Sequence, residues 1–477
     1  MRQTLTRRKI LAAGAAGLTG TMLSSSLSAA DSLKPVQVRV NPDHVLGQTP
    51  RDFLGFGYEI SSVAVKGLLS DSNRTLVQFY RTLGTEGVVR IGGNTSDFST
   101  WAPDGEAVSA PKATVTNRAV IDDLGRFVHA TGWKLIWGLN LGSGTVESAV
   151  DQAVAVAAAA KDRLLCFQIG NEPDLFSRSD HRPAGYGYAE YIQDFRRFAA
   201  ELRKGLPGVA LGGPDVAGST DWVASFAQDG GSNIKLLTEH YYRAGQKQPA
   251  ATFKNLLHTD PRFVKMTDQL REDSHRFGIP YRLVELNSFS GGGKLGVSDT
   301  FTSALWALDL LFTLAFADGA GINLETGVNQ LGFISPYSPI FDDEHGRFTA
   351  RPSYYAMLAF ALAGRGKRLE TSLDASGVNM TAYSVVNDEG QTWLTLINKD
   401  VSSGAHVKIA CPQGSRSAEV MRLTAPAFDS KTDVTLAGSE VSGDGQWKAK
   451  RSDRLKQSGG SVKIELPTAS AAFIRFS

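Results

Sequence analysis

Two glutamates stand where short apolar strands are expected to end: Glu172 in QIGNEPD (168–174) and Glu285 in YRLVELN (281–287). The fold alone gives no reason for a carboxylate at the end of an apolar strand, because burying a charge costs free energy. Two carboxyl groups that flank one cavity are what cleavage of a glycosidic bond requires. One protonates the leaving oxygen, and the other attacks the anomeric carbon. We therefore take Glu172 and Glu285 as candidate catalytic residues.

The elements that must position this pair repeat along the chain. From about Arg51 to Gly364, short apolar strands alternate with helical patterns, which is typical of a parallel sheet covered by helices. The expected strands are 53–60, 87–94, 134–141, 164–172, 209–216, 235–242, 281–287 and 320–326. Eight strand-helix repeats predict an α/β fold, the (β/α)₈ TIM barrel, over 51–364. Its catalytic groups come from the carboxyl ends of strands, so Glu172 on strand four and Glu285 on strand seven should face each other.

After about Lys367 the chain shows strands without helices, separated by Gly, Ser, Asp and Pro turns. This pattern predicts a C-terminal β-sandwich domain over 365–477. The early stretch PVQVRVN (35–41) also alternates like a strand. We expect the segment 31–50 to cross over and join that sandwich.

The first thirty residues have the pattern of an export signal. A basic start is followed by a moderately apolar stretch and by small residues up to Ala30. Arg7 and Arg8 stand side by side before this weakly hydrophobic segment, which indicates the twin-arginine route of bacteria. The sequence thus predicts a secreted or periplasmic bacterial protein that is exported folded, with an ordinary secretory signal as the alternative.

Composition excludes several classes of partner. The formal net charge is +2 and the basic residues are spread along the chain, so neither nucleic acid nor a membrane surface is an expected partner. The apolar run 304–317 carries Asp309 and reads as a core helix rather than a membrane span. Cys166 and Cys411 lie far apart and suggest no disulfide framework. We predict no metal site and no cofactor, and the sequence carries no signal for an oligomeric state.

Residues beside Glu172 have expected roles in holding it and its substrate. Asn171 can hydrogen-bond the sugar 2-hydroxyl, a contact that strengthens at the transition state. Pro173 restricts the residue before it, so we expect an extended backbone at Glu172.

Residues expected around Glu285 come from other strand ends. Arg90 is interpreted as a charge that supports the nucleophile or the fold, and His240 as a supporting wall residue. Tyr241 is predicted to hydrogen-bond the nucleophile, because a phenol near a carboxylate stabilises its ionised form.

Three segments resemble one known family. QIGNEPD, EHYY and VELNSFSGGGKLGVSDTFTSALWALDLL are similar to heparanase and the bacterial β-glucuronidases, the retaining glycoside hydrolases of family 79. The resemblance implies a (β/α)₈ barrel paired with a β-sandwich. It also implies that Glu172 is the general acid/base, that Glu285 is the nucleophile, and that Asn171 is the partner of the 2-hydroxyl.

The same resemblance implies a binding site for the carboxylate of a uronic acid. The substrate carboxylate would meet backbone amides of the loop Gly291, Gly292 and Gly293, and Tyr337. A second family tyrosine, expected just before the glycines, is Ser290 here. Glu59 and Asp97 would bind hydroxyls of the terminal sugar. The function implied is a retaining exo-β-glucuronidase acting on a β-glucuronide or a uronic-acid-containing glycan.

Three other functions stay open from the sequence. Ser290 leaves room for a neutral or 4-O-methylated sugar in a related β-glycosidase. A non-catalytic carbohydrate-binding protein is a second alternative. The third is endo cleavage of a heparan-like polymer, for which the basic stretch KAKRSDRLK (448–456) offers a contact.

Overall fold

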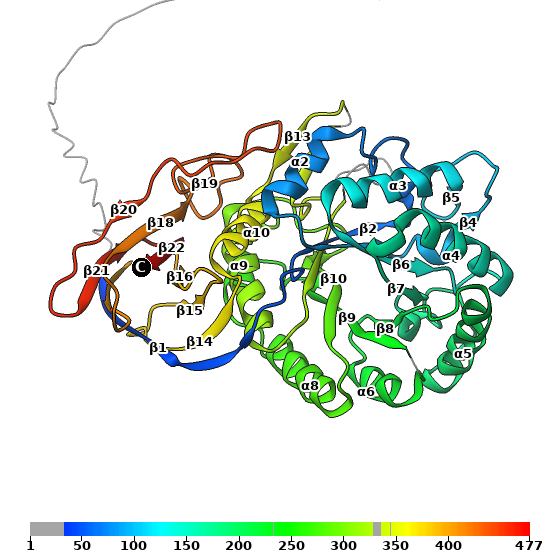
Figure 1. Ribbon diagram of the computed structural model, residues 1–477, viewed down its shortest axis with the longest axis horizontal. Helices are drawn as coiled ribbons and strands as arrows, with labels where there is room; N and C mark the ends of the chain where they lie inside the picture. The colour runs from blue at the N-terminus through cyan, green and yellow to red at the C-terminus, as the bar shows by residue number, and fades with distance from the viewer. Residues whose placement is uncertain (1–32, 232, 328–334, 344) are drawn as a thin grey trace, which may run out of the picture.

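The protein consists of a barrel and a large β-sheet domain that lie side by side (Figure 1). The computed structural model describes residues 33–231, 233–327, 335–343 and 345–477. The predicted export signal at 1–30 lies outside these residues. Among the described residues, no helix has the length and apolar character to cross a membrane.

Eight strands form a closed barrel, in the order β10-β11-β2-β3-β6-β7-β8-β9, and every paired neighbour is parallel. Each of the eight predicted strands is present, which confirms the TIM barrel. Their bounds are β2 Gly55–Glu59, β3 Val88–Gly92, β6 Lys134–Leu139, β7 Leu164–Ile169, β8 Leu211–Val216, β9 Ile234–Gly245, β10 Tyr281–Ser290 and β11 Ile322–Glu325.

Helices surround this barrel, and several of them have a side-chain cap at the N-terminus. In α8, for example, the Asp260 carboxylate accepts from the Arg262 N–H, Pro261 opens the helix, and Gly278 closes it in the left-handed conformation. The helices are α1 Ile60–Val63, α2 Arg74–Leu83, α3 Arg118–Thr131, α4 Val146–Ala160, α5 Tyr188–Gly205, α6 Thr220–Asp229, α7 Phe253–Leu257, α8 Pro261–Phe277, α9 Phe301–Phe316 and α10 Pro352–Ala363.

Short elements lie in the loops between the strands and helices. They comprise three 3₁₀ turns and two small two-stranded sheets: η1 Ser96–Phe98, η2 Lys161–Arg163, η3 Pro173–Leu175, β4 Thr100–Trp101 with β5 Val115–Thr116, and β12 Ile340–Asp342 with β13 Phe348–Ala350.

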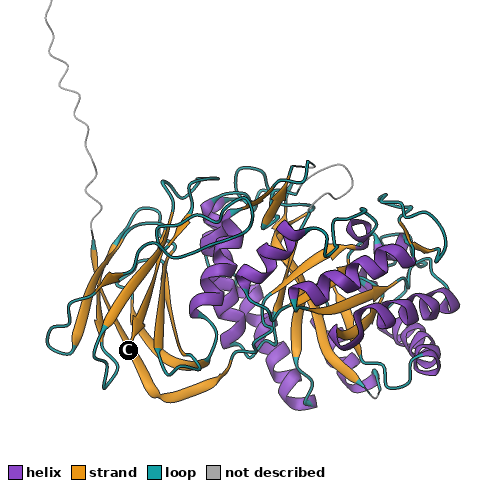
Figure 2. Cartoon of the chain, turned by 45° about the horizontal axis from the view of Figure 1, so that its top comes forward, coloured by secondary structure: helices purple, strands orange, loops and turns teal. Residues whose placement is uncertain are grey.

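The second domain is a ten-stranded sheet (Figure 2). One buried apolar cluster contains Val36 and Val407, from strands near one end of the sheet, and Leu394 and Ile474, from strands nearer the other end. Because these side chains share one core, the sheet folds over on itself as a sandwich. Its strands are β1 Lys34–Gln48, β14 Lys367–Asp374, β15 Met380–Val386, β16 Thr392–Asn398, β17 Ala405–Ala410, β18 Ala418–Thr424, β19 Thr435–Leu436, β20 Asp453–Arg454, β21 Ser461–Leu466 and β22 Ser470–Phe476.

Strand β1 joins the N-terminal end of the described chain to this sheet. It pairs antiparallel with β14, through Val40 and Thr371, and parallel with β17, through Val36 and Val407. The predicted crossover is therefore confirmed. Strand β1 runs the length of the sheet domain before the chain enters the barrel (Figure 1).

Helix α9 lies between the barrel and the sheet, which explains why it is apolar all round. Its single acidic residue, Asp309, meets the sheet directly. The Asp309 carboxylate accepts hydrogen bonds from Thr381 at 2.6 Å and from Tyr383 at 2.9 Å, and it pairs with Lys399. The run 304–317 is thus a core helix, as predicted, and its one charge ties the two domains together.

Candidate active site

Glu172 and Glu285 meet at the mouth of the barrel. One carboxylate oxygen of each, together with a ring nitrogen of His240, lie within 4.8 Å of one another. Both glutamates line a cavity of about 650 Å³. The predicted pairing of strands four and seven across one cavity is therefore present. Carboxylate oxygens this close leave room for a single sugar carbon between the two carboxyl groups, which fits the short spacing of retaining enzymes rather than the wider one of inverting enzymes.

The backbone at Glu172 is not extended, so that prediction is wrong. Glu172 has φ 52° and ψ 51°, in the left-handed region, and it precedes the 3₁₀ turn Pro173–Leu175. Its N–H donates to the carbonyl of Asp215 at 2.8 Å. A residue before proline avoids the right-handed helical conformation, and Glu172 adopts the left-handed region instead of an extended one. Such a conformation is costly for a non-glycine residue and is typical of functional sites.

Two donors hold the carboxylate of Glu285. Arg90 donates from Nη1 to Oε2 at 2.8 Å, and Tyr242 donates its hydroxyl to Oε1 at 2.9 Å. The prediction for Tyr241 is wrong, because its hydroxyl donates to Asp260 at 2.8 Å. Side chains alternate along β9. Tyr241, next to His240, therefore faces the helices, and Tyr242 faces the cavity.

Arg90 is fully buried and joins four polar partners. Besides Glu285, Nη2 donates to Asn171 Oδ1 and to Asp215 Oδ2, both at 2.7 Å, and Nε lies 3.4 Å from Gln168 Oε1. Burial opposes the charge, but the neighbouring carboxylates of Asp215 and Glu285 outweigh it and raise the pKa of Arg90. The guanidinium therefore remains a fixed positive charge beneath the nucleophile.

His240 connects Glu172 to Asp215. Its Nδ1 lies 3.1 Å from Glu172 Oε1, and its Nε2 lies 3.0 Å from Asp215 Oδ1. Burial opposes ionisation of both groups. Arg90 and His240 nevertheless lower the pKa of Asp215 to about 2, and the carboxylates raise the pKa of His240 well above its usual value. Both ring nitrogens are thus occupied as in an imidazolium.

Glu172, His240 and Glu285 also have the residue types of a metal site. A histidine that binds a metal ion must be a neutral imidazole with one ring nitrogen free for the ion. Because carboxylates engage both nitrogens of His240, the arrangement suits hydrogen bonding and proton transfer rather than metal coordination.

The two catalytic candidates have different environments. Burial raises the pKa of Glu172, the hydrogen bond and charge of His240 lower it, and the charge of Glu285 raises it again. Glu285, by contrast, sits directly on Arg90 and Tyr242. A pair of carboxyls whose surroundings differ in this way supports one acid and one anion.

Two further carboxyl groups line the same cavity. Glu59 accepts from the N–H of Asn94 at 3.1 Å and from the N–H and hydroxyl of Thr95 at 2.7 Å, and burial raises its pKa to about 7. Glu325 is 2% exposed, and neither of its oxygens has a hydrogen-bond partner among the described residues. Burial and the charge of Glu285 raise the pKa of Glu325 well above its usual value.

Asp97 has a different place from the predicted one. Its Oδ1 accepts from the N–H groups of Leu141 and Gly142, both at 2.9 Å, and its Oδ2 accepts from the N–H of Asn171 at 2.8 Å. It is buried and does not line the cavity of Glu172 and Glu285. We therefore correct it from a substrate ligand to a residue that positions the backbone of Asn171.

The predicted uronate loop does reach the cavity. Ser290, Gly291, Gly292 and Tyr337 line it. The three glycines 291–293 all have φ between 82° and 97°, a conformation that side-chain-bearing residues avoid. The Gly292 carbonyl accepts from the N–H of Tyr337 at 3.2 Å, and the rings of Tyr337 and Tyr242 stack at 6.3 Å. The loop after β10 is thereby held against the loop after β11.

Sequence reasoning passed over Asp215, Tyr242 and Gln168. Asp215 carries the positive φ of 64° in strand β8 and binds both Arg90 and His240. The position of Tyr242 could have been predicted. Once His240 is placed on the cavity side, the alternation of side chains along a strand puts Tyr242 on the same side. No signal in the sequence distinguishes Gln168 from an ordinary buried strand residue.

Comparison with known proteins gives a family for the C-terminal part. Residues 382–473 match the glycosyl hydrolase family 79 C-terminal beta domain. The chain is a glycoside hydrolase, and its C-terminal part is similar to family 79. This confirms the resemblance seen in the sequence motifs.

Relatives and solved structures extend the similarity over most of the chain. A β-glucuronidase of Aspergillus niger is 27% identical over 470 residues, covering 84% of this chain and 86% of the relative. A β-glucuronidase of Neurospora crassa is 25% identical, covering 61% and 58%. The structure of a 4-O-α-L-rhamnosyl-β-D-glucuronidase from Fusarium oxysporum matches with TM-score 0.74 at 17% identity, covering 92% and 99%. The last comparison bears on the fold alone.

Proposed function

We propose that this protein is a retaining exo-acting β-glucuronidase that removes terminal β-linked glucuronic acid from glycosides or oligosaccharides. The observation that carries the proposal is the pair Glu172 and Glu285, with carboxylate oxygens within 4.8 Å of each other at the mouth of one barrel. The β-glucuronidases among its relatives support the choice of sugar.

In the first step Glu285 attacks the anomeric carbon. A bond forms between its carboxylate oxygen and that carbon, the glycosidic bond breaks, and Glu172 gives its proton to the leaving oxygen. Arg90 and Tyr242 hold the attacking carboxylate of Glu285 in place, because both donate hydrogen bonds to it. The raised pKa of Glu172 keeps a proton available on the acid.

In the second step Glu172 changes from general acid to general base. The ionised Glu172 takes a proton from water, the water oxygen bonds to the anomeric carbon, and Glu285 leaves as a carboxylate. His240 assists the switch, since an imidazolium 3.1 Å away stabilises Glu172 while it is ionised.

The glycine loop supports the preference for a uronic acid. Consecutive amides of Gly291 and Gly292, at positive φ, offer N–H groups to an anion without a side chain in the way. The hydroxyl of Tyr337 supplies a further donor at the same wall. Asn171 lies next to Glu172 and would bind the 2-hydroxyl.

The assignment is tested with Glu285→Gln and Glu172→Gln on an aryl β-glucuronide. Glu285→Gln should lower kcat roughly a thousandfold or more, because the covalent route is lost. Glu172→Gln should lose far more activity on an aglycone with a poor leaving group than on an activated phenol. Azide should restore turnover to Glu172→Gln and yield a β-glucuronosyl azide. The surface variant Glu440→Gln serves as the control, and normal turnover by Glu285→Gln would refute the proposal.

A second candidate is a β-glycosidase for a neutral or 4-O-methylated sugar. The observation that favours it is Ser290, which stands where the family resemblance places a tyrosine, together with the carboxyls of half-buried Glu59 and buried Glu325 at the same cavity. Matched aryl β-glucuronide and β-glucoside distinguish the two. A higher kcat/KM on the glucoside would transfer the assignment to this candidate.

Export by the twin-arginine route belongs to the same proposal, with Arg7 and Arg8 as its motif. Changing both to lysine should retain the precursor in the cytoplasm. Continued export of the double variant would indicate an ordinary secretory signal.

A further inference from the structure

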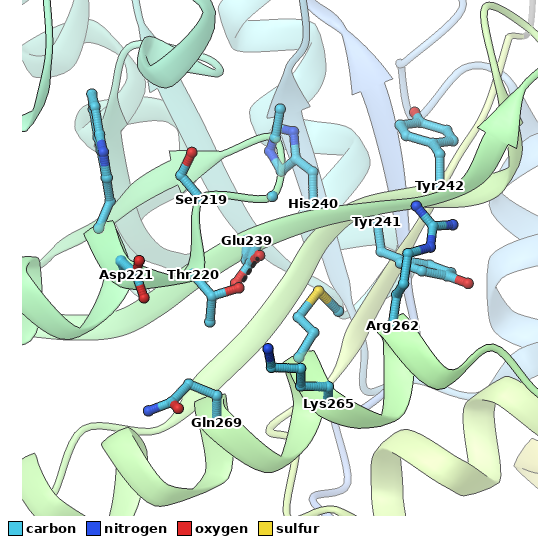
Figure 3. A pocket seen from close by; sticks show the side chains of 14 residues that line it. Ser219, Thr220, Asp221, Glu239, His240, Tyr241, Tyr242, Arg262, Lys265 and Gln269 are labelled. Atoms are coloured by element: carbon cyan, nitrogen blue, oxygen red, sulfur yellow. Dashed lines mark hydrogen bonds between the residues drawn. The ribbon is translucent and has the colours of Figure 1, made fainter.

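Strand β9 presents its side chains to two different spaces. His240 and Tyr242 face the barrel mouth, where they contact Glu172 and Glu285. The intervening positions, including Glu239, face the other way because side chains alternate along a strand. Figure 3 shows Glu239 turned toward helices α6 and α8.

A second cavity of about 590 Å³ is lined by Glu239 and Tyr241 from this side of β9, and also by His240 and Tyr242. The start of α6, the strand β9 and the helix α8 enclose it, and Ser219, Thr220, Lys265 and Gln269 surround it with Glu239 (Figure 3). Trp222 contributes an indole whose ring stacks on Tyr191. The cavity is thus lined by hydroxyl groups, an amide, an ammonium group and an aromatic ring.

Glu239 is the buried polar group of this cavity. It is 1% exposed, and Thr220 donates to its Oε1 at 2.9 Å. Its Oε2 has no hydrogen-bond partner among the described residues. A buried oxygen without a partner is costly, and a hydroxyl-bearing ligand is one way to satisfy it. Burial also raises the pKa of Glu239 to about 8, so a neutral carboxyl can both donate and accept.

The cavity adjoins the catalytic one. Ala217, Tyr242 and Arg262 line both. The loop before α6 is fastened to the turn that follows the acid/base, since Asp174 accepts from the Ala217 N–H at 3.0 Å and from the Ser219 hydroxyl at 2.7 Å. A ligand between α6 and α8 therefore lies next to the loop that is fastened to the turn after Glu172, the residue that protonates the leaving group in the proposed mechanism.

We propose that this cavity is a carbohydrate subsite that holds the sugar unit on the leaving-group side of the scissile bond. The inference rests on the proposed function. Glu239 and Gln269 hydrogen-bond the hydroxyls of that sugar, and the enzyme thereby prefers glycan substrates over simple aryl glucuronides.

The chemistry of the lining favours a neutral sugar over a sulfated one. Arg262 already donates to the Asp260 carboxylate at 2.9 Å and to the carbonyl of Arg243 at 2.6 Å. Asp221 would repel an anion, and the charge of His240 is already met by the carboxylates of Glu172 and Asp215, which leaves Lys265 as a cation of the cavity that could attract one. Mixed donors and acceptors beside an aromatic ring match a polyhydroxylated ring with an apolar face.

The test compares kcat/KM on β-glucuronosyl-hexose disaccharides, with glucose, galactose and mannose as the hexose, against kcat/KM on a matched aryl β-glucuronide. The proposed function requires activity on the aryl substrate by the unmodified enzyme, so its failure shows separately. Glu239→Gln and Gln269→Ala should each lower the disaccharide-to-aryl ratio about tenfold on the best disaccharide, as expected for one or two lost hydrogen bonds.

Arg276→Ala, at an exposed position on the same helix α8, is the matched control and should leave the ratio unchanged. Gln269 is also exposed, so Gln269→Ala keeps the test valid if Glu239→Gln impairs folding, which thermal melting reports. An unchanged ratio in both variants would overturn the proposal. A higher kcat/KM on a sulfated disaccharide than on its neutral counterpart would overturn the neutral-sugar assignment.

Discussion

His240 and Glu172 are joined side chain to side chain, with 3.1 Å between Nδ1 and Oε1. The other ring nitrogen is bound by Asp215, which carries a full charge because its pKa lies near 2. The imidazolium therefore opposes the burial that raises the pKa of Glu172. The proton affinity of the acid/base results from these two opposing effects.

Removing the imidazolium should move the pH profile. Without His240 the pKa of Glu172 rises further, since the cation that favours its ionised form is gone. Glycosylation needs protonated Glu172, so the basic limb of kcat/KM on an aryl β-glucuronide should shift to higher pH in His240→Gln. A full pH-rate profile measures this. A basic limb that stays in place or moves to lower pH would contradict the role assigned to His240.

Tyr242 and Tyr241 form a matched pair for testing which phenol serves the nucleophile. Tyr242→Phe removes the hydrogen bond to Glu285 at 2.9 Å and should lower kcat on an aryl β-glucuronide by about tenfold to a hundredfold. Tyr241→Phe removes the bond to Asp260 outside the barrel, which does not involve Glu285, and should change kcat little. Equal losses in the two variants would contradict the assignment.

The sequence predicted the barrel well because each strand-helix repeat is a local signal. The runs that end at Glu172 and Glu285 could be assigned to strands four and seven from the alternation alone, and the closed barrel then brings them together. The apolar run around Asp309 was also interpretable, since a single charge in a buried helix implies a partner.

The failures involve features that depend on three-dimensional context. The left-handed backbone of Glu172 depends on a hydrogen bond from its N–H to Asp215, a residue on the next strand. The burial of Asp97 by backbone amides of another loop is equally non-local. The choice between Tyr241 and Tyr242, by contrast, required only the strand period, applied from His240.

Asp215 should contribute to acid stability. Its pKa is lowered from 3.8 to about 2, so its contribution is fully present above pH 4 and is lost as the pH falls toward 2. The lowering corresponds to roughly 2 kcal/mol of unfolding free energy. Asp215→Asn should therefore be destabilised most above pH 4, and its difference from the unmodified protein should shrink below that. Urea midpoints measured from pH 2 to 7 check this, and a constant difference would contradict it.

Glu325 should destabilise the fold as the pH rises. Its pKa is raised by burial and by Glu285, so the folded state binds a proton that the unfolded state releases above its ordinary pKa near 4.5. Stability is therefore lost between pH 4.5 and the raised pKa of the folded protein. Glu325→Gln is neutral at every pH and keeps the size of the side chain. Its melting temperature, relative to that of the unmodified protein, should thus increase as the pH rises above 4.5, until the raised pKa of Glu325 is passed. The matched variant Glu440→Gln, in the sheet domain, should show no such trend, and a flat difference for Glu325→Gln would mean that this carboxyl is ionised in the folded protein.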